Sequence, residues 1–412
     1  MTEPIADELS QGVKDAQAKF DAGMGADGDA SPYPLLAKLR AQAPVHPGWP
    51  EMGIPPVEPG TGQQIFTAYT FDAVKAVFTD NETFSTKCYE AIVRPLQGPT
   101  ILEMQDPEHA LYRRLHEFAF ARSSMRRWES ELVRPLVERT VDRFRDRKSA
   151  DLVEEVFMPI PVRVIAALLG LPDSDIPEFH RLAIDLLGFY SDMDAALKAS
   201  AEMKEYFVGI LADRRVEPKD DMVSKLAAAD INGIRMSDEQ IYGFMRNLLP
   251  AGAETTSRST ASLAHGLLTH PDQLHAVTVD RSLLPQAIEE GIRWETPLLN
   301  FMRETTRDAE FFGTEIPSGS TVSVNLGSAN HDAARWDRAE EFDIFRERKP
   351  HIGFGHGAHV CLGMHLARLE STMIFNTLFD RLPGLRLDPD APPPYVAGTF
   401  FRSPQHLKVI WD

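Results

Sequence analysis

The segment that decides the fold is FGHGAHVCLG, residues 354–363, and a helix-like run, residues 364–370, follows it directly. The three glycines of the segment allow turn conformations and let the backbone approach a flat, bulky group. Amide groups at the N-terminus of the following helix favour a thiolate over a thiol. This pattern predicts that Cys361 is an anionic metal ligand.

Two other interpretations of the loop stay open at this stage. Cys361 can be a buried structural cysteine beside a turn, as most isolated cysteines are. It can also form a zinc site with three nearby histidines, His356, His359 and His365. A closed structural zinc site usually shows paired Cys-x-x-Cys or His-x-x-x-His spacing, and this rule disfavours zinc here.

The loop resembles the haem-ligand loop of the cytochrome P450 family, whose pattern is Phe-x-x-Gly-x-His/Arg-x-Cys-x-Gly. Every fixed position of the pattern is met, by Phe354, Gly357, His359, Cys361 and Gly363. The resemblance extends over nearly the whole chain from about residue 33 onward. It implies haem b bound through the Cys361 thiolate, in a fold that is mainly α with a minor β part and forms one large helical domain around the haem.

The chain has 412 residues, of which 61 are acidic and 43 basic, and its formal charge is -18. This excess of negative charge argues against a nucleic-acid scaffold and is typical of a freely diffusing, soluble protein. Cys88 and Cys361 lie far apart and make no disulfide framework, which suits a reducing compartment. Residues 1–29 show no signal pattern and no apolar run that could span a bilayer. We therefore expect a cytoplasmic protein that binds neither nucleic acid nor membrane.

The chain divides into a polar N-terminal arm, residues 1–30, which we expect to be flexible, and a haem domain, residues 31–412. Ordered structure is expected from Tyr33. Proline clusters at 44–59 and 389–394 predict loops rather than a domain linker. Helical spacing predicts helices at 33–43, 107–121, 128–147, 162–169, 197–214, 238–270, 284–294 and 362–381. Strand-like runs are shorter, at 64–69, 321–325 and 406–411.

The longest helical pattern contains the segment NLLPAGAETT, residues 247–256. Leu248, Ala251, Gly252 and Thr255 fall on one face by three- and four-residue spacing, and the small residues among them leave room for a ligand. Glycine costs roughly 1 kcal/mol against alanine in a helix interior, so Gly252 indicates that space matters there. Thr255 can donate a hydrogen bond back to the carbonyl of residue 251 and loosen the helix.

This segment resembles the family's Ala-Gly-x-Glu/Asp-Thr motif, in the helix that crosses the oxygen-binding face of the haem. The resemblance implies that Thr255 stabilises bound oxygen, that Glu254 relays protons, and that Ala251 and Gly252 contact the cofactor. Splitting the O–O bond consumes two protons that bulk water must not supply freely, hence the carboxylate and the alcohol. Without the cysteine loop, the pair can be a surface glutamate and an incidental threonine. Pro250 departs from the commoner aliphatic residue and predicts a kink just before the site.

Glu290 and Arg293 lie three residues apart in the helix predicted at 284–294 and can pair on one face. They match the family's Glu-x-x-Arg pair, and Arg346 matches its third member. Such pairs are common by accident and contribute little when they are exposed. The position of this pair, between the long helix and the cysteine loop, implies a structural role on the proximal side and not catalysis.

Haem carries two propionate carboxylates, which need cationic or hydrogen-bonding partners when they are partly buried. The resemblance supplies four candidates at the expected places: His109, Arg113, Arg303 and His359. A histidine and an arginine four residues apart on a helix are more often simply solvated. The coincidence of all four positions favours propionate binding.

The segments that line the family's substrate pocket are apolar and partly aromatic in this chain. Each of these side chains can equally be plain core packing. The pocket candidates are Phe189, Tyr190, Phe244, Leu248, Leu298, Leu299, Phe301, Phe400 and Phe401. Cys88 lies in a variable segment and is treated as incidental.

A local basic patch near the cysteine loop can steer an acidic redox partner, because the rest of the chain is so acidic. Scattered solvated charge is an equally simple interpretation. The residues concerned are Arg113, Arg114, Arg126, Arg127, Arg348 and Lys349.

Together these features predict a bacterial-type haem-thiolate monooxygenase that inserts one atom of O2 into a small apolar substrate by hydroxylation. No flavin or nucleotide-binding segment follows the haem region. Electrons are therefore expected from NAD(P)H through a separate [2Fe-2S] ferredoxin and its reductase. One alternative is a peroxygenase driven by H2O2, although its relatives replace the acid and alcohol by Arg and Pro. The other is a haem-thiolate sensor without turnover, in which Glu254 and Thr255 have no purpose.

Overall fold

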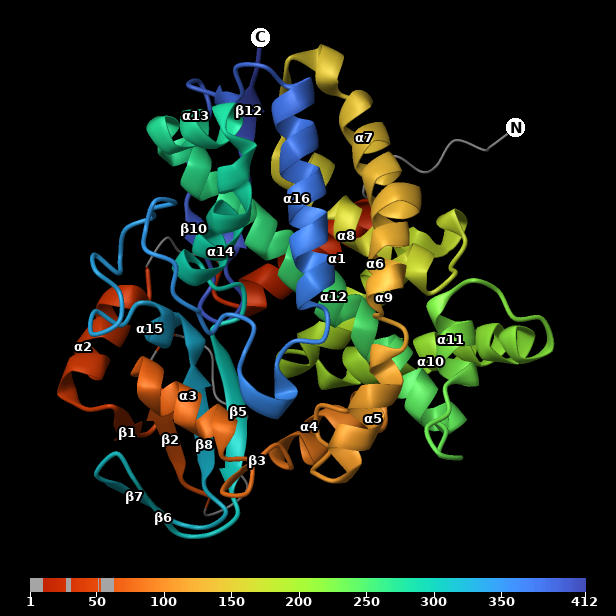
Figure 1. Ribbon diagram of the computed structural model, residues 1–412, viewed down its shortest axis with the longest axis vertical. Coiled ribbons are helices and arrows are strands. Elements are labelled where there is room, and N and C mark those ends of the chain that lie inside the picture. The colour runs from red at the N-terminus through yellow and green to blue at the C-terminus, as the bar shows by residue number, and fades with distance from the viewer. Residues whose placement is uncertain (1–9, 27–30, 51, 53–62) are drawn as a thin grey trace.

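The computed structural model describes residues 10–26, 31–50, 52 and 63–412. Within them the protein is mainly α-helical, and a five-stranded sheet lies at one end of the molecule (Figure 1). This arrangement confirms the predicted fold class. Among the described residues, the apolar stretches within helices are too short or too often interrupted by charge for any of them to cross a bilayer.

The α-helices of the described residues are α1 (Gln11–Gly23), α2 (Tyr33–Gln42), α3 (Phe71–Thr79), α4 (Cys88–Gln97), α5 (Glu108–Glu117), α6 (Arg122–Trp128), α7 (Arg134–Asp142), α8 (Pro159–Leu168), α9 (Ile176–Leu187), α10 (Met193–Val216), α11 (Met222–Ala228), α12 (Asp238–Thr269), α13 (Pro271–Val279), α14 (Leu284–Trp294), α15 (Leu326–Asn330) and α16 (Met364–Arg381). Short 3₁₀ or π segments are η1 (Glu129–Val133), η2 (Arg145–Arg147), η3 (Val153–Phe157), η4 (Asp173–Asp175), η5 (Gly188–Tyr190), η6 (Arg281–Leu283) and η7 (Gly357–His359).

The largest sheet has the strand order β1-β2-β8-β5-β3. Strand β8 is its centre, paired in parallel with β2 and antiparallel with β5. All five residues of β8 are buried, as expected for a strand with covered faces. The strands are β1 (Val45–Pro47), β2 (Ile65–Ala68), β3 (Phe84–Ser85), β4 (Ser149–Asp151), β5 (Asn300–Thr305), β6 (Ala309–Phe311), β7 (Thr314–Ile316), β8 (Thr321–Asn325), β9 (Arg386–Leu387), β10 (Val396–Ala397), β11 (Ser403–Pro404) and β12 (Lys408–Ile410).

Helix α12 is the central element of the helical part. A capping box of Ser237 and Gln240 starts it, and most of its residues are buried. It contacts α8, α10, α14 and α16, and its apolar side chains belong to the largest core cluster. The helix continues through Pro250 without a break. The residues before and after the predicted site are therefore on one continuous helix.

Several predicted elements agree closely with the structure. The helix at 284–294 and the strand at 321–325 coincide with α14 and β8. The long helix predicted at 238–270 is α12, which ends one residue earlier. The proline-rich stretch 389–394 carries neither helix nor strand. The loop predicted at 44–59 is wrong at Val45–Pro47, which form strand β1, and its residues 51 and 53–59 lie outside the described residues.

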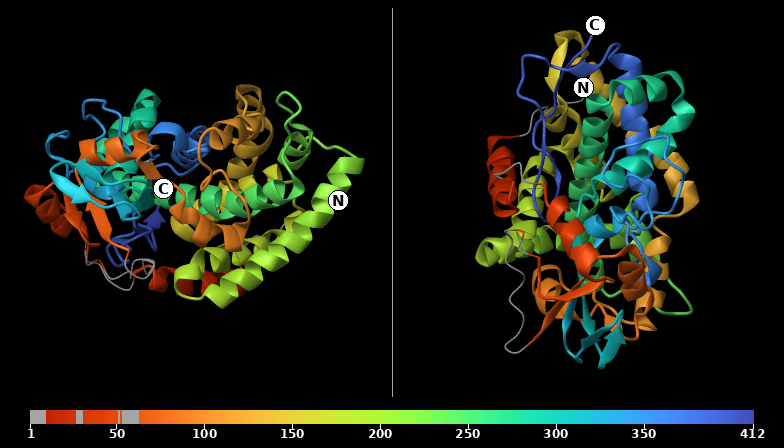
Figure 2. Two further views of the ribbon diagram at one scale, coloured as in Figure 1. Left: turned by 90° about the horizontal axis from the view of Figure 1, so that it is seen from below. Right: turned by 90° about the vertical axis from the view of Figure 1, so that its left-hand side faces the viewer.

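The prediction of a flexible arm is wrong for the part of the N-terminal segment that the structure describes. Residues 11–23 form helix α1, which Ser10 caps by accepting from the N–H of Val13 at 3.4 Å. Val13 and Phe20 are buried and pack with Ile184 of α9. In Figure 2, α1 appears in red beside the yellow-green helices, and it contacts α9 and η5. Residues 1–9 and 27–30 lie outside the described residues.

The single helix predicted at 128–147 is also wrong in detail. The structure has α6 up to Trp128, the π segment η1 and then α7. Pro135 has no N–H to donate into an α-helical ladder, and it lies in the first turn of α7. The π segment accommodates the interruption.

Candidate active site

Glycines shape the loop that carries Cys361. Gly357 has φ of +72°, and a Cβ at this position would lie 2.3 Å from the carbonyl oxygen of Phe78 in α3. Only glycine fits such a contact. The N–H of Cys361 donates to the carbonyl of Phe354 at 2.9 Å, and α16 begins at Met364. The loop thus places the cysteine directly before a helix N-terminus, as predicted.

Opposing influences act on the thiol of Cys361. Burial raises its pKa, whereas the N–H groups of Gly363 and Met364 and the charges of Arg113 and Arg368 act to lower it. The residue keeps an exposed surface although protein atoms enclose most of its surroundings. A metal ion bonded to sulfur removes the thiol proton outright, which resolves this conflict. The surroundings of Cys361 therefore suit a metal-bound thiolate.

Among the described residues, His109 and Arg303 carry buried side-chain nitrogens for which the structure offers no hydrogen-bond partner. The atoms without a partner are both ring nitrogens of His109 and the Nε of Arg303. Each residue is only 2% exposed, and the nearest carboxylate to His109 is Asp106, at 3.5 Å from Nδ1. Orphaned donors of this kind are rare in native proteins. They indicate that an acceptor belongs at this place.

His359 joins this group from the cysteine loop. Its ring stacks on that of His109 with centroids 3.9 Å apart. Burial and the positive neighbours His109, Arg303 and Arg113 lower the pKa of His359 to about 2. The structure thus brings the four predicted propionate partners together, from α5, β5 and η7. This fits an anionic group such as the two haem propionates, whose charge would satisfy the unpaired donors.

Thr255 makes the back-bond that its sequence context predicts. Its Oγ1 donates to the carbonyl of Ala251 at 2.7 Å. Ala251 is exposed and Thr255 partly exposed, although most of α12 is buried. A short open strip within a central helix is where a ligand can reach the backbone.

The interpretation of Gly252 needs correction. A Cβ at this position would lie 2.7 Å from Cδ1 of Ile165 in α8. The missing side chain therefore allows α12 and α8 to pack closely, and the room it leaves lies on the α8 side. The glycine thus favours close packing of α12 on α8, and the predicted contact of its backbone with the cofactor stays a prediction.

Glu254 has partners that the sequence analysis did not anticipate. Its carboxylate is buried and accepts from Nε of Arg258 at 2.6 Å. Nε2 of Gln17 in α1 also donates to it, at 3.3 Å. The carboxylate is thus held on the same helix as Thr255 by two fixed donors.

The Glu-x-x-Arg pair forms with the predicted third member. Arg293 binds Glu290 through two hydrogen bonds of 2.8 Å, and Nε of Arg346 lies 3.3 Å from Oε1 of Glu290. Arg293 also donates to the carbonyls of Asn330, Ala339 and Glu341. Arg293 is only 1% exposed, so the pair joins α14 to the chain before the cysteine loop as an internal support.

A second ion pair on α14 was missed by the sequence analysis. Arg368 of α16 binds Glu289 through hydrogen bonds of 2.7 and 2.8 Å. Its guanidinium lies 4.7 Å from the ring centroid of Phe354, at the start of the cysteine loop. Glu289 also pairs with His351 at 3.2 Å. The only signal in the sequence was the acidic residue next to Glu290, because the partner is nearly eighty residues away.

The predicted pocket residues divide into two groups. Phe189, Tyr190, Leu298 and Phe400 are partly exposed and lie with Phe401 around α1 and α9. Phe301 is also partly exposed. The others are buried, namely Phe244, which packs on His116, together with Leu248 and Leu299. The first group stays a candidate pocket wall, and Leu299, at 0% exposure, is core packing.

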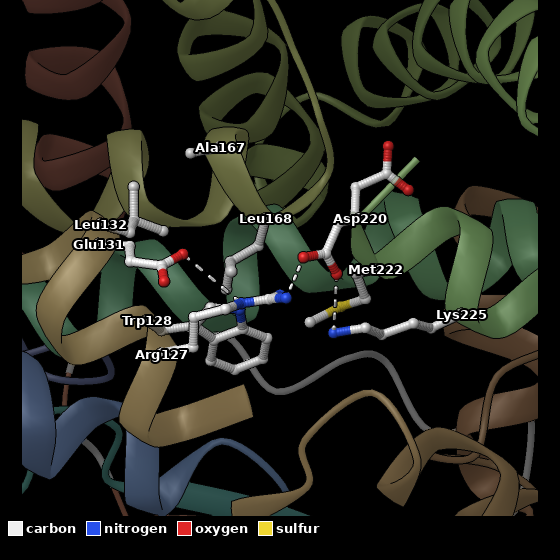
Figure 3. Close-up of a pocket in the computed structure, with 10 residues that line it drawn as sticks. Arg127, Trp128, Glu131, Leu132, Ala167, Leu168, Asp220, Met222 and Lys225 are labelled. Atoms are coloured by element: carbon white, nitrogen blue, oxygen red, sulfur yellow. Dashed lines mark hydrogen bonds and ion pairs between the residues drawn. The ribbon is translucent and has the colours of Figure 1, made fainter. Parts of the chain in front are cut away.

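A cavity of about 220 Å³ lies elsewhere, between α6, α8 and α11 (Figure 3). Charged side chains line much of it, and Asp220 pairs with Arg127 and with Lys225. None of the predicted site residues except Arg127 borders it. Since Asp220 neutralises Arg127, this arginine contributes little to the predicted basic patch.

The zinc interpretation finds no support in the geometry. Among the described residues, the group of potential metal ligands that comes together is Asp151, Glu154 and His406, far along the chain from Cys361. His406 and the N–H of Leu407 already donate to Asp151, and Lys14 pairs with Glu154. These groups satisfy one another without a metal.

A cysteine placed before a helix N-terminus, beside histidine and arginine side chains whose buried nitrogens include several without a partner, defines the class of protein, one that binds haem through a thiolate. Residues 162–409 match the family model described as Cytochrome P450. Cytochrome P450 monooxygenase PikC of Streptomyces venezuelae is 35% identical over 393 residues, which are 92% of this chain and 90% of that protein. Steroid C26-monooxygenase of Mycolicibacterium smegmatis is 34% identical, over 84% of this chain and 87% of that protein.

The fold comparison agrees with the sequence comparison. The crystal structure of CYP108D1 from Novosphingobium aromaticivorans superposes with a TM-score of 0.82 and 31% identity, over 98% of this chain and 99% of that one. The chain belongs to the cytochrome P450 family, whose members bind haem b and incorporate an atom of O2 into their substrates. The predicted family, enzyme class and cofactor are thereby confirmed.

Proposed function

We propose that the protein hydroxylates an apolar organic substrate, with electrons from NAD(P)H supplied through a [2Fe-2S] ferredoxin and its reductase. The observation that carries the proposal is that His109 and Arg303, which hold buried nitrogens without a hydrogen-bond partner, converge on His359 of the Cys361 loop. These donors would hold the haem propionates, and Cys361 would ligate the iron. Haem, when bound through a thiolate, supplies O2 activation, because the sulfur pushes electron density toward O–O cleavage.

The protein's own residues would bind, orient and supply protons. Thr255 would offer its hydroxyl at the open strip of α12, where its Oγ1 now donates to Ala251. Glu254 would deliver protons from the buried side of the same helix turn. Protons would then arrive through a few fixed groups and not from bulk water. Uncontrolled protons from bulk water would divert electrons to hydrogen peroxide.

The substrate wall would be the aromatic group of Phe189, Tyr190 and Phe400, with Leu298 beside it. Partly exposed aromatic and aliphatic side chains suit an apolar ligand. A relative named steroid C26-monooxygenase supports substrates of steroid size. We therefore rank rigid, apolar ring systems above fatty acids.

The test has two parts. Compounds are first screened for the change of the ferric haem spectrum from water-bound to five-coordinate; apolar ring systems should cause it. Turnover is then driven by ferredoxin, reductase and NAD(P)H under isotopically labelled O2, and one labelled atom should enter the product. A response to polar macrolides alone would contradict the substrate class. Turnover with H2O2 that matches the ferredoxin-driven rate would favour a peroxygenase instead.

A further inference from the structure

Helix α1 makes a polar contact with the centre of α12. Gln17 donates to Asp21 at 3.1 Å and to Glu254 at 3.3 Å. Nη2 of Arg258, one turn after Glu254, donates to Asp21 at 2.6 Å. Two residues of α1 and two of α12 thus form one buried network, which we call the α1–α12 network. It joins the N-terminal helix to the proposed proton donor.

Arg258 is the centre of the α1–α12 network, and each of its nitrogens is engaged. Nε binds Glu254 at 2.6 Å, Nη2 binds Asp21, and Nη1 binds Oγ of Ser403 at 3.2 Å. The rings of Phe20 and Phe401 lie 5.7 and 5.5 Å from the guanidinium carbon. The side chain is 4% exposed, so its position is fixed on all sides.

Charge within the α1–α12 network does not balance. Asp21 and Glu254 bring two carboxylates, whereas Arg258 brings one positive charge, and the three side chains are buried. Burial raises the pKa of Asp21, Arg258 acts to lower it, and the charge of Glu254 acts to raise it. Two buried carboxylates that share one guanidinium compete for it, so neither has the charge of Arg258 to itself.

We propose that α1 is a working part of the oxygen site, and that Asp21 and Gln17 are positioning residues that act on Glu254 through Arg258. Asp21 draws part of the guanidinium away from Glu254, so that Glu254 can take up and release a proton. This inference rests on the proposed role of Glu254 and Thr255. It assigns a function to a helix outside the segments that carry the family motifs.

The direction of the effect follows from the charges. Arg258 of α12 and Asp21 of α1 are the charged groups that the structure places against Glu254, and Ser403 of β11 adds a hydroxyl on the far side of Arg258. In Asp21→Asn, Glu254 loses a negative neighbour and has Arg258 to itself. The attraction between Arg258 and the Glu254 carboxylate then has no competitor in Asp21, and it favours the charged form of Glu254 over the form that donates a proton.

The experiment compares Asp21→Asn with Lys19→Ala in the full chain with haem bound. Lys19 is a matched control, because it ties the same helix to Asp192 at 2.9 Å through an exposed pair that does not touch the network. We expect Asp21→Asn to lower product formed per NAD(P)H oxidised by up to roughly tenfold and to move the alkaline limb of the rate–pH profile to lower pH. Lys19→Ala should change neither.

A double variant separates positioning from mere structural support. If Asp21 acts through Glu254, then Asp21→Asn should have no further effect on coupling in a Glu254→Gln background. An equal loss in both backgrounds would overturn the inference, as would wild-type coupling in Asp21→Asn. If Glu254→Gln itself leaves coupling and the solvent isotope effect unchanged, the proposed role of Glu254 fails instead. The two failures are therefore distinguishable.

Discussion

The two sides of the proposed haem site are stabilised in different ways. The proximal region comprises residues 351–363 with α14 and α16, and ion pairs within it involve Glu289, Glu290 and Arg293. The distal region comprises the middle of α12 and α1, joined by Arg258. In the proximal region arginines bind carboxylates and backbone carbonyls that hold a loop in place. In the distal region one arginine is shared by two carboxylates.

The difference shows how charge serves two purposes in one fold. A buried pair whose remaining donors are all satisfied by carbonyls, as Arg293 is, fixes geometry. A network with one carboxylate in excess, such as the α1–α12 network, is where we propose that a proton is exchanged. Substitutions in the proximal region should therefore reduce stability and haem retention. Substitutions in the distal region should change coupling while the protein stays folded.

The largest effect is expected for Arg293→Ala, in the proximal region. Removal of Arg293 leaves the buried Glu290 carboxylate with a weaker set of partners and three carbonyls without their donor. Breaking a buried pair in this way costs about 3–5 kcal/mol of unfolding free energy. Urea denaturation and haem content per chain measure the loss. Arg235→Ala, at an exposed pair with Asp230, is the control and should change little. Unchanged stability in Arg293→Ala would show that the pair is no structural support.

Thr255→Ala tests the distal region. Loss of the hydroxyl should divert electrons to hydrogen peroxide and lower coupled product formation by about tenfold or more, with stability nearly unchanged. Peroxide and product are measured per NAD(P)H consumed. Thr269→Ala is a matched control, since Thr269 makes the same back-bond at the end of the same helix, to His265 at 2.7 Å. Equal coupling in the two variants would contradict a role for Thr255.

Arg368→Ala should have a smaller, pH-dependent effect in the proximal region. Burial acts to raise the pKa of Glu289, but hydrogen bonds from Arg368 and His351 outweigh it and bring the pKa to about 2. A depressed carboxyl pKa stabilises the fold above the ordinary value of 4.5, and this stability is lost as the pH falls toward 2. Both side chains are about a third exposed, so we expect a loss of only about 1 kcal/mol at neutral pH.

Urea denaturation across a pH series measures this difference. The wild type should be more stable than Arg368→Ala at pH values above the ordinary pKa of Glu289, and the two should converge in strong acid. A stability difference that does not change with pH would mean that Arg368 acts through its packing on Phe354 alone.

The sequence predicted the parts of the site whose signal is local. Cys361 and Thr255 were found because a turn or a helix turn fixes their surroundings within a few residues. Helix 284–294 was found to the residue, since its apolar spacing is regular and Pro285 marks its start. The Glu290–Arg293 pair needed only the i, i+3 geometry of a helix.

The rest depended on contacts between distant parts of the chain. Asp21 and Arg258 are 237 positions apart, and neither lies in a motif. The helix that carries Asp21 had a local signal, in the spacing of Val13, Ala16 and Phe20, but its polar composition obscured it. The role of Gly252 depends on Ile165 of another helix, so only the packed structure could assign it.

The central claim is that the sulfur of Cys361 bonds to haem iron. The most direct test is the absorption spectrum of the purified, reduced protein under carbon monoxide, with Cys88→Ser as the control for the other cysteine. We predict the strongly red-shifted Soret band of sulfur-ligated haem in the wild type and in Cys88→Ser, and its loss in Cys361→Ser. A wild-type protein that lacks this band even after haemin is added, or a Cys361→Ser variant that keeps it, would contradict the account.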